Sequence, residues 1–288
     1  MGGESQIVPL LPTHKEGFNV KLTYKNFKFN VDARRPLFVV VSGAHAYGTE
    51  RADSDLDVRG VRMPTLEWAV SLARDERGVQ HTEGNIDVSI HNVYHFLSVL
   101  LHGNGTFLEN MFEPLLYEDP AFKSLRPLVM KYGVSKRFAN HYYGFVRSSI
   151  KEYDKTKQIK KILYAYRSLL AGICLFQAGK VEYDLNVLIE KITAPFGTTF
   201  HWEHVKILLD KYQNESDILM PNEEPMPRVI PELNELIKVF GEPAQTDFKT
   251  CTFKLGRMIT DSGFPDEPDY EPFNKWLLSD LLDEKERT

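Results

Sequence analysis

The sequence contains few cysteines and no long apolar run. Its 288 residues include only Cys174 and Cys251, which are far apart and form no CxxC pair. Zinc sites built on clustered cysteines are therefore excluded, and two isolated thiols are typical of a reduced, cytoplasmic protein. No stretch approaches the ~20 apolar residues of a membrane helix, and the N-terminus lacks the charged start and apolar core of a secretory signal. We therefore expect a cytoplasmic protein without a membrane partner.

Two common phosphate-binding motifs are also missing. The sequence contains neither GxxxxGK[ST] nor GxGxxG, so folds that depend on a phosphate-binding loop or a dinucleotide-binding turn have no support. It contains no internal repeat and no low-complexity tract, which excludes repeat architectures. The length is that of one large domain or two smaller ones.

The charge is unevenly distributed along the chain. The formal net charge is −5, but residues 121–180 contain thirteen Lys or Arg and only two acids, Glu152 and Asp154. That segment therefore carries +11 and the rest of the chain −16. A basic face on an acidic protein attracts phosphates, so a nucleotide or nucleic acid is an expected partner. The solvated side of ordinary helices explains the same lysines equally well.

The first 119 residues have the pattern of an α/β domain. Residues 1–17 are predicted to be a flexible tail, and residues 18–31 alternate apolar and polar positions as an extended segment or hairpin does. Asn92 is the expected cap of a helix that Gly103 ends, and Ser42-Gly43-Ala44 is the expected tight turn. Strands are predicted at residues 37–41, 57–63 and 85–91.

The pattern changes after Pro120, where helical periodicity dominates. Helices are predicted at residues 134–156, 157–179, 184–193 and 201–213. Residues 214–231 are rich in proline and acids and are predicted to be a loop. The predicted organisation is a tail at 1–17, an α/β domain at 18–119 and a helical domain at 120–288.

The most informative stretch runs from Val41 to Pro64 and reads VSGAHAYGTERADSDLDVRGVRMP. Gly43 follows a buried strand and allows the backbone to approach a ligand closely. Asp55 and Asp57 are two residues apart on the next strand, so their carboxylates point the same way. Two like charges held so close stay ionised when a cation lies between them. Mg²⁺ (or Mn²⁺) is therefore the expected cofactor.

This pattern resembles the signature of the DNA polymerase β-like nucleotidyltransferase superfamily, in which a turn after the first strand is followed by an Asp-x-Asp pair on the next. The fuller pattern SGxxxYGxxxxxSDxDxRGV resembles a bacterial and phage family of nucleotidyltransferases linked to RNA repair. The residues that carry the resemblance are Ser42, Gly43, Tyr47, Gly48, Ser54, Asp55, Asp57, Arg59, Gly60 and Val61. It implies an α+β fold, with a polymerase-β-like catalytic domain and its mixed sheet at 18–119, followed by the C-terminal helical domain.

The resemblance extends over residues 36 to 180. Ile86-Asp87-Val88 is similar to the family's third-carboxylate strand, and Lys160-x3-Tyr164-x2-Arg167 is similar to its helical K-x3-H-x2-R pattern. It implies that the catalytic residues and metal ligands are Asp55, Asp57 and Asp87. It also implies a set of nucleotide-binding residues: Ser42, Gly43, Ala44, His45, Ser54, Lys160, Tyr164 and Arg167.

Two residues depart from the family pattern. Ala44 stands where the superfamily has serine, so a hydroxyl contact to the triphosphate is missing, while the backbone N–H groups of the turn remain. Tyr164 stands where the family helix has histidine. Neither change affects the three aspartates. Lys160, Tyr164 and Arg167 are spaced i, i+4 and i+7, so they are expected on one helical face, where the two cations neutralise pyrophosphate.

Two further residue groups allow more than one interpretation. Arg59 follows the acidic pair on the same strand face and is expected to orient a carboxylate or to contact a phosphate. His91 and His95 have the HxxxH spacing of zinc ligands, but a strand-to-helix boundary is predicted between them, which argues against a zinc site.

The expected activity is transfer of a nucleoside monophosphate from a nucleoside triphosphate to a hydroxyl acceptor. An RNA 3′ end, or another nucleic acid, is the expected acceptor. One alternative keeps the chemistry but changes the acceptor to a protein side chain or a small molecule. A second alternative is a non-catalytic nucleic-acid-binding module. The preferred nucleotide and the oligomeric state do not follow from the sequence.

Overall fold

The structure is a computed structural model that describes residues 36–72, 78–191, 202–215 and 262–287. It also describes six single residues: Asp217, Val229, Pro231, Leu233, Asn234 and Ile259. The tail predicted at 1–17 and the extended segment predicted at 18–31 lie outside the described residues, as does most of the loop predicted at 214–231.

The described strands form one mixed sheet. They are β1 (Pro36–Ser42), β2 (Leu56–Arg62), β3 (Gly78–Glu83), β4 (Ile86–Asn92) and β5 (Leu115–Glu118). Their order across the sheet is β3-β4-β2-β1-β5. β2 and β4 run parallel, whereas the other neighbouring pairs run antiparallel. The predicted α+β class with a mixed sheet is confirmed.

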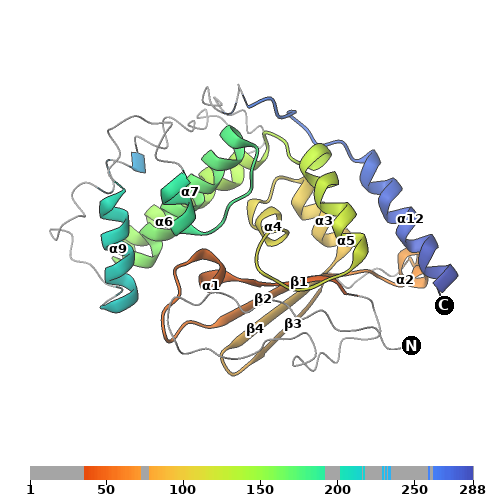
Figure 1. Ribbon diagram of the computed structural model, residues 1–288, viewed down its shortest axis with the longest axis horizontal. Coiled ribbons are helices and arrows are strands. Elements are labelled where there is room, and N and C mark those ends of the chain that lie inside the picture. Colours follow the sequence, from red (N-terminus) through yellow and green to blue (C-terminus); the bar gives the residue numbers. More distant parts are fainter. Residues whose placement is uncertain are drawn as a thin grey trace.

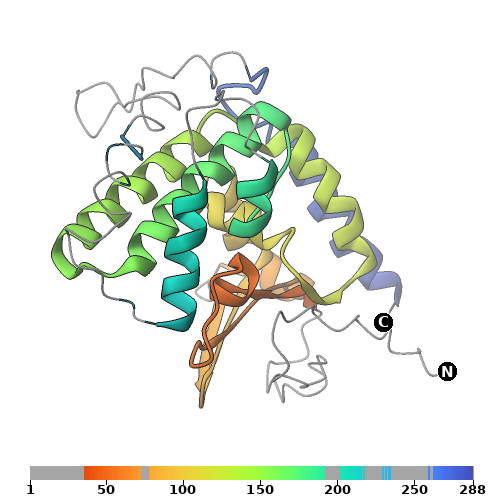
Figure 2. The ribbon, with the colours of Figure 1, turned by 60° about the vertical axis from the view of Figure 1, so that its left-hand side comes forward.

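Helices cover one face of this sheet (Figure 1). In chain order they are α1 (Gly43–Tyr47), α2 (Leu66–Val70), α3 (Val93–Leu101), α4 (Gly105–Asn110), α5 (Pro120–Leu128), the π-helix η2 (Val129–Gly133), α6 (Phe138–Thr156), α7 (Ile159–Ala178), α8 (Leu185–Lys191), α9 (Glu203–Asn214) and α12 (Glu271–Arg287). Figure 2 shows the sheet nearly on edge, with the long helices α6 and α7 above it. No helix in the described residues is both long and apolar enough to cross a membrane.

Local capping explains where several helices begin. The side chain of Asn92 accepts a hydrogen bond from the backbone N–H of Tyr94, so the predicted cap of α3 is confirmed. Asp119 caps α5 in the same way, and Pro120 occupies the first turn, where its missing N–H is not needed. Gly103 has a φ of 90° and lies just beyond the end of α3, where a left-handed residue ends a helix without strain.

The predicted strands at 37–41, 57–63 and 85–91 are confirmed within about a residue, and the four predicted helices correspond to α6, α7, α8 and α9. The turn predicted at Ser42-Gly43-Ala44 instead opens the five-residue helix α1, which has a positive φ at its first residue, Gly43, and is followed by a positive φ at Gly48. β3 and β5 were not predicted. β3 is an exposed edge strand without apolar alternation, and β5 has only four residues.

Alternating residues divide the sheet between two hydrophobic clusters. Phe38 and Val40 of β1 join the large cluster beneath the helices, whereas Val39 and Val41 join a smaller cluster on the opposite face. Phe38 stacks on Phe122 of α5 with ring centroids 4.2 Å apart, so β1 is fastened directly to the helical layer. The large cluster extends on both sides of residue 120. The division into domains at 18–119 and 120–288 remains a prediction.

Candidate active site

A row of polar residues crosses the sheet at right angles to its strands. Ser42 of β1 is opposite Asp57 of β2, Asp57 is opposite Asp87 of β4, and Asp87 is opposite Thr82 of β3. Directly opposed residues project from the same face of a sheet. That face is the one beneath the helices, because Asp57 is two residues from Arg59, whose partner in β1 is the core residue Val40. The parallel pairing of β2 and β4 therefore places two carboxylates side by side.

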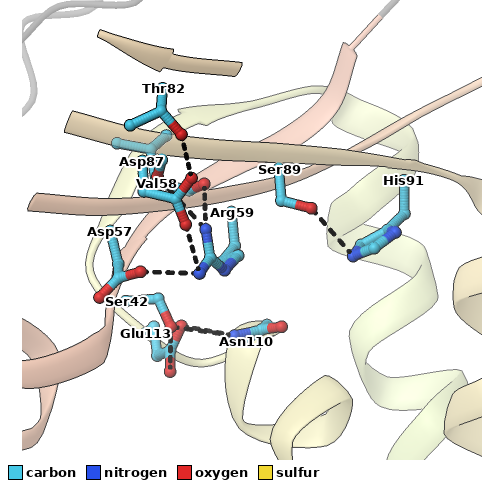
Figure 3. Close-up of polar contacts among 10 residues, drawn as sticks. All are labelled: Ser42, Asp57, Val58, Arg59, Thr82, Asp87, Ser89, His91, Asn110 and Glu113. Carbon is cyan, nitrogen blue, oxygen red and sulfur yellow. Dashed lines mark hydrogen bonds and ion pairs between the residues drawn. The ribbon is translucent and has the colours of Figure 1, made fainter. Parts of the chain in front are cut away.

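Arg59 lies between these two carboxylates (Figure 3). Its Nη2 donates to Asp57 Oδ1 at 2.7 Å and to Asp87 Oδ2 at 3.2 Å. Its Nη1 donates to the backbone carbonyls of Asp87 and Val58. Thr82 Oγ1 donates to the other oxygen of Asp87 at 3.1 Å. A single guanidinium thus holds both carboxylates in place, which is the first of the two roles expected for Arg59.

The carboxyl group of Asp57 is partly buried among charged neighbours. Burial raises the pKa of Asp57 above its ordinary value. The charges of Arg59 and Lys160 lower this pKa, whereas the neighbouring carboxylates of Asp87 and Asp55 raise it. Gly43 lies against the same carboxylate, since a Cβ added at this position would be 2.0 Å from Asp57 Oδ2. Its φ of 65° also suits glycine. Glycine is required here by both space and backbone conformation.

A cavity of about 490 Å³ opens beside Asp55 and Asp57. This volume is within the usual range of small-molecule sites. Six of its lining residues belong to the predicted site: Ala44, Ser54, Asp55, Asp57, Lys160 and Tyr164. The other six were not predicted: Arg51, Asp53, Gln158, Lys161, Tyr212 and Asp217. The cavity therefore joins the motif of residues 41–64 to the first turns of α7 and the end of α9.

Helix α9 fastens the loop that precedes β2. Arg51 Nη1 donates to the carbonyl of Tyr212 at 2.9 Å, and its guanidinium lies 5.1 Å from the Tyr212 ring centroid. Gln213 Nε2 donates to the carbonyl of Glu50 at 3.2 Å. Ser54 Oγ accepts from the backbone N–H of Arg51 at 2.9 Å, which closes the turn before Asp55. No local pattern marks Tyr212 as a site residue, because it follows the motif by about 150 residues.

The first turns of α7 bring a cation to the cavity. Lys160 Nζ lies 5.5 Å from the ring centroid of Tyr164, and the backbone N–H of Lys160 donates to Asp217 Oδ1 at 2.9 Å. Within the described part of the chain, Lys160 forms no ion pair with a carboxylate, and its charge acts on Asp57. The cavity thus has carboxylates on one side and a lysine with an aromatic ring on the other.

Arg167 does not line this cavity. Its side chain is 3% exposed, and its Nη1 forms an ion pair with Glu109 Oε2 at 2.7 Å. Its guanidinium lies 3.8 Å from the ring centroid of Tyr47, whose ring meets Tyr164 edge-on at 6.1 Å. Arg167 therefore connects α7 to α4 and α1 from behind the cavity. Helical spacing predicted that Lys160, Tyr164 and Arg167 lie on one face of α7. The turn that carries Arg167 is buried, however, so this side chain packs against α4 and α1 and does not reach the cavity.

Ser42 is likewise turned away from the cavity. Its Oγ donates to Glu113 Oε1 at 3.2 Å and accepts from Asn110 Nδ2 at 3.3 Å, and all three side chains are buried. Burial raises the pKa of Glu113 to about 8, with a further increase from Glu109. His45 and Asp87 are not among the lining residues, and Asp87 faces Arg59 and Thr82 instead.

The thirteen cations of residues 121–180 are all described, and seven of them form ion pairs with carboxylates. Lys136 and Arg137, for example, pair with Asp266 and Glu267 near the other end of the chain. Four of the seven pairs use acids from other segments, so part of the local excess of +11 is neutralised in the folded chain. Two of these cations, Lys160 and Lys161, line the cavity. Lys161 pairs with Glu152, whereas Lys160 has no carboxylate partner among the described residues.

The acidic residues fit a divalent cation in part. Among the described residues, no three His, Cys, Asp or Glu side chains are gathered closely enough to bind a metal ion. Asp55 and Asp57 nevertheless share one cavity and offer oxygen donors whose mutual repulsion favours a cation. Mg²⁺ commonly uses one or two carboxylates and completes its ligands with substrate phosphates and water. The pair of Asp55 and Asp57 fits this arrangement.

A mixed sheet with paired aspartates on adjacent strands, beside a cavity reached by a helical lysine, is the arrangement expected for the DNA polymerase β-like superfamily. The chain belongs to the RlaP family, described as the RNA repair pathway DNA polymerase beta family, whose model matches residues 18–195.

One relative among curated proteins is YcgL of Bacillus subtilis (strain 168), whose activity is uncharacterised. The two are 27% identical over 165 residues, which cover 55% of this chain and 63% of that protein. The chain thus spans less than two thirds of the length of this relative.

Two solved structures are similar in outline. The first is spectinomycin adenyltransferase AAD(9) from Enterococcus faecialis with ATP and spectinomycin, with a TM-score of 0.41, 14% identity, and coverage of 71% of this chain and 92% of that one. The second is a nucleotidyltransferase-like protein from Exiguobacterium sibiricum 255-15, with a TM-score of 0.30, 11% identity, and coverage of 70% and 67%. Neither likeness is close enough to assign a role to any residue of this chain.

The buried ion pair generates a prediction about stability. Arg167→Met should lower the free energy of unfolding by about 3–5 kcal/mol, because it leaves the Glu109 carboxylate buried without its partner. Adding Glu109→Gln should recover part of this loss, since the unpaired charge is then gone. Arg147→Met on the exposed side of α6 is the matched control and should change stability by less than about 0.5 kcal/mol. Equal urea midpoints for wild type and Arg167→Met would contradict the assignment.

The buried carboxyl group of Glu113 generates a prediction about pH. Its pKa rises from 4.5 to about 8 on folding, so the folded state binds this proton more tightly than the unfolded state does. Stability should therefore fall as the pH rises from 4.5 to about 8, by up to about 1.4 kcal/mol per pH unit. Glu113→Gln can accept from Asn110 through its amide oxygen and donate to Ser42 Oγ through its amide nitrogen. It cannot ionise, so its profile should be flatter. Parallel profiles for the two proteins, measured by urea unfolding across this range, would show that Glu113 does not titrate as described.

Proposed function

We propose that the protein transfers a nucleoside monophosphate from a nucleoside triphosphate to a hydroxyl acceptor, with Mg²⁺ or Mn²⁺ as cofactor and an RNA 3′ end as acceptor. The observation that carries this proposal is the alignment of Asp57 with Asp87 across two parallel strands, beside a cavity that also contains Asp55 and Lys160. In nucleotidyl transfer the acceptor oxygen forms a bond to the α-phosphorus while the bond to pyrophosphate breaks. Negative charge therefore has to be neutralised on both sides of that phosphorus.

The cavity suits a nucleoside triphosphate. Lys160 supplies positive charge for the departing pyrophosphate, and the ring of Tyr164 beside it offers a flat surface for stacking or hydrogen bonding. Arg51, fixed on Tyr212, contributes a second cation at the wall. Arg167 supports this wall indirectly, because it holds Tyr47, whose ring contacts Tyr164.

Asp55 and Asp57 would hold the divalent cation, which when bound acts as a Lewis acid on the phosphate oxygens. Asp87 stands beside Asp57 but outside the cavity, and its side chain is 40% exposed. It is therefore the carboxylate that an acceptor hydroxyl meets when it approaches from the side opposite the triphosphate. There it orients the hydroxyl, while Thr82 donates a hydrogen bond to it and Arg59 balances its charge.

RNA is the favoured acceptor because the chain belongs to a family described by RNA repair. The acceptor distinguishes this proposal from a protein-modifying or small-molecule-modifying enzyme of the same chemistry. The test is incubation with labelled nucleoside triphosphates, Mg²⁺ or Mn²⁺, and RNA whose 3′ end is either free or blocked. Label should enter only the free-ended RNA.

Aspartate replacements should separate binding from chemistry. Combined Asp55→Asn and Asp57→Asn should abolish cation-dependent nucleotide binding, because both carboxylates of the cavity are lost. Asp87→Asn should lower single-turnover transfer by roughly a hundredfold or more while nucleotide affinity stays within about twofold, as expected for a group that acts mainly in the transition state. Asp53→Asn is the matched control, since its carboxylate lines the same cavity but is 81% exposed. Transfer at the wild-type rate by Asp87→Asn would remove Asp87 from the catalytic set.

Arg59 and the divalent cation would compete for the carboxylate of Asp57. Arg59→Gln should therefore raise the affinity for Mn²⁺, measured by electron paramagnetic resonance without nucleotide, by roughly three- to tenfold, since half-exposed ion pairs are worth about 1 kcal/mol. The same variant should lower transfer, because Asp57 and Asp87 lose their common support. Arg51→Gln, which removes a cavity arginine that does not contact Asp57, should leave Mn²⁺ affinity close to wild type. Weaker Mn²⁺ binding by Arg59→Gln would mean that orientation of the carboxylates outweighs competition.

A further inference from the structure

A strip of aromatic side chains leads away from Asp87 on the side opposite the nucleotide cavity. Its members are His91, His95, Phe107, His102 and His141, so it contains four of the nine histidines of the chain. His91 lies four residues after Asp87 on β4 and projects from the same sheet face, about 13 Å along the strand. Figure 3 shows Ser89 and His91 following Asp87 along this strand.

The rings at the beginning of the strip touch one another. The centroids of His91 and Phe107 are 5.0 Å apart, and those of His91 and His95 are 5.5 Å apart. The predicted boundary between β4 and α3 does separate the two histidines, yet the chain turns so that their rings meet. All three rings are only partly buried, so their contacts with one another leave surface for a ligand.

The strip continues along α3 to a second cavity. His95, Val99 and His102 follow at i, i+4 and i+7 on one face of α3, which extends about 10 Å beyond His95. A cavity of about 440 Å³ lies at this end and is lined by Ser98, Val99, His102, Gly103, Asn104, Arg137, Asn140 and His141. Thr106 Oγ1 lies 3.4 Å from His141 Nε2, which joins the helix carrying Phe107 to this wall.

The chemistry of the strip suits unpaired bases better than a metal ion. Among the described residues, no three of these side chains lie close enough to bind a metal. Burial lowers the pKa of His91 to about 4, with His95 and Arg59 adding to the effect. Burial and the charge of Arg167 do the same for His141. Both imidazoles are thus neutral at pH 7, so each is a flat ring with one donor and one acceptor, the properties that stack on bases and bond to their edges.

We propose that this histidine strip binds the single-stranded 3′ segment of the acceptor nucleic acid and delivers its terminal hydroxyl to Asp87. This inference rests on the proposed function, because it names the path of the acceptor to the same site. Arg137 lines the far cavity, and its charge is balanced by Glu267. The strip extends over more length than a drug-sized acceptor occupies, and it leads to Asp87 instead of to the triphosphate cavity.

Binding of RNA in the absence of nucleotide tests the strip apart from catalysis. The probe is a short single-stranded oligoribonucleotide of mixed sequence, and its affinity is measured by fluorescence anisotropy. His95→Ala combined with His102→Ala should weaken binding by roughly fivefold or more, since base stacking is lost. His95→Phe should retain most of the affinity, because the ring remains. His81→Ala on the exposed strand β3 is the matched control, and thermal unfolding of each variant establishes that it is folded.

Cross-linking locates the RNA end. The same probe with 4-thiouridine at its 3′ terminus should cross-link to peptides within residues 86–107. Two results would show that the histidine strip does not bind the acceptor. One is unchanged RNA affinity in the alanine variant, and the other is cross-links confined to other segments. If the wild-type protein still labels RNA in either case, the proposed function stands. Transfer of label by wild type to protein or to a small molecule, with none to RNA, would overturn the RNA acceptor and the strip with it. If the wild-type protein does not bind a nucleoside triphosphate, the proposed function itself fails.

Discussion

The arrangement of the site depends on two carboxylates held side by side on neighbouring parallel strands. The register of β2 and β4 puts Asp57 against Asp87, and repulsion between like charges at this distance has to be neutralised for the strands to pair as they do. Arg59 provides that neutralisation from within the same strand, two residues away. The guanidinium therefore has a structural role in the free protein and occupies the region where chemistry needs cations.

A second ion pair, deeper in the protein, controls the shape of the cavity. Arg167 and Glu109 are buried together, and Tyr47 lies over the guanidinium. Taking two charges out of water is costly, so such a pair is weak evidence for stability in itself, but it specifies one arrangement of the helices that carry it. Here it sets how α7 meets α1 and α4, and hence where Lys160 and Tyr164 stand. In the free protein, Arg167, which family resemblance suggests for phosphate binding, thus contacts Glu109 and Tyr47.

The nucleotide cavity and the histidine strip lie on opposite sides of Asp87. One side collects carboxylates and lysine, which suit a triphosphate with its cation. The other side collects neutral rings, which suit bases. Since α3 follows directly on β4, the same short stretch of chain supplies both the third carboxylate and the beginning of the strip. This proximity in sequence means that any shift of β4 moves Asp87 and the beginning of the histidine strip together.

The sequence alone determined three strands, four of the helices after Pro120, and Asp55 and Asp57 as candidates, and the family resemblance that it carries added the α+β class and Asp87. Those conclusions depend on local periodicity and on short spacing, which neighbouring residues dictate. The tertiary structure decided which residues share the cavity. Tyr212 of α9 reaches it by packing on Arg51, and Asp217, which follows α9, reaches it by accepting a hydrogen bond at the beginning of α7. It also decided that Arg167 faces Glu109, since helical spacing defines a face but not the partner that the face meets. Register between distant strands and burial of charge are properties of the packed chain, and no local pattern encodes them.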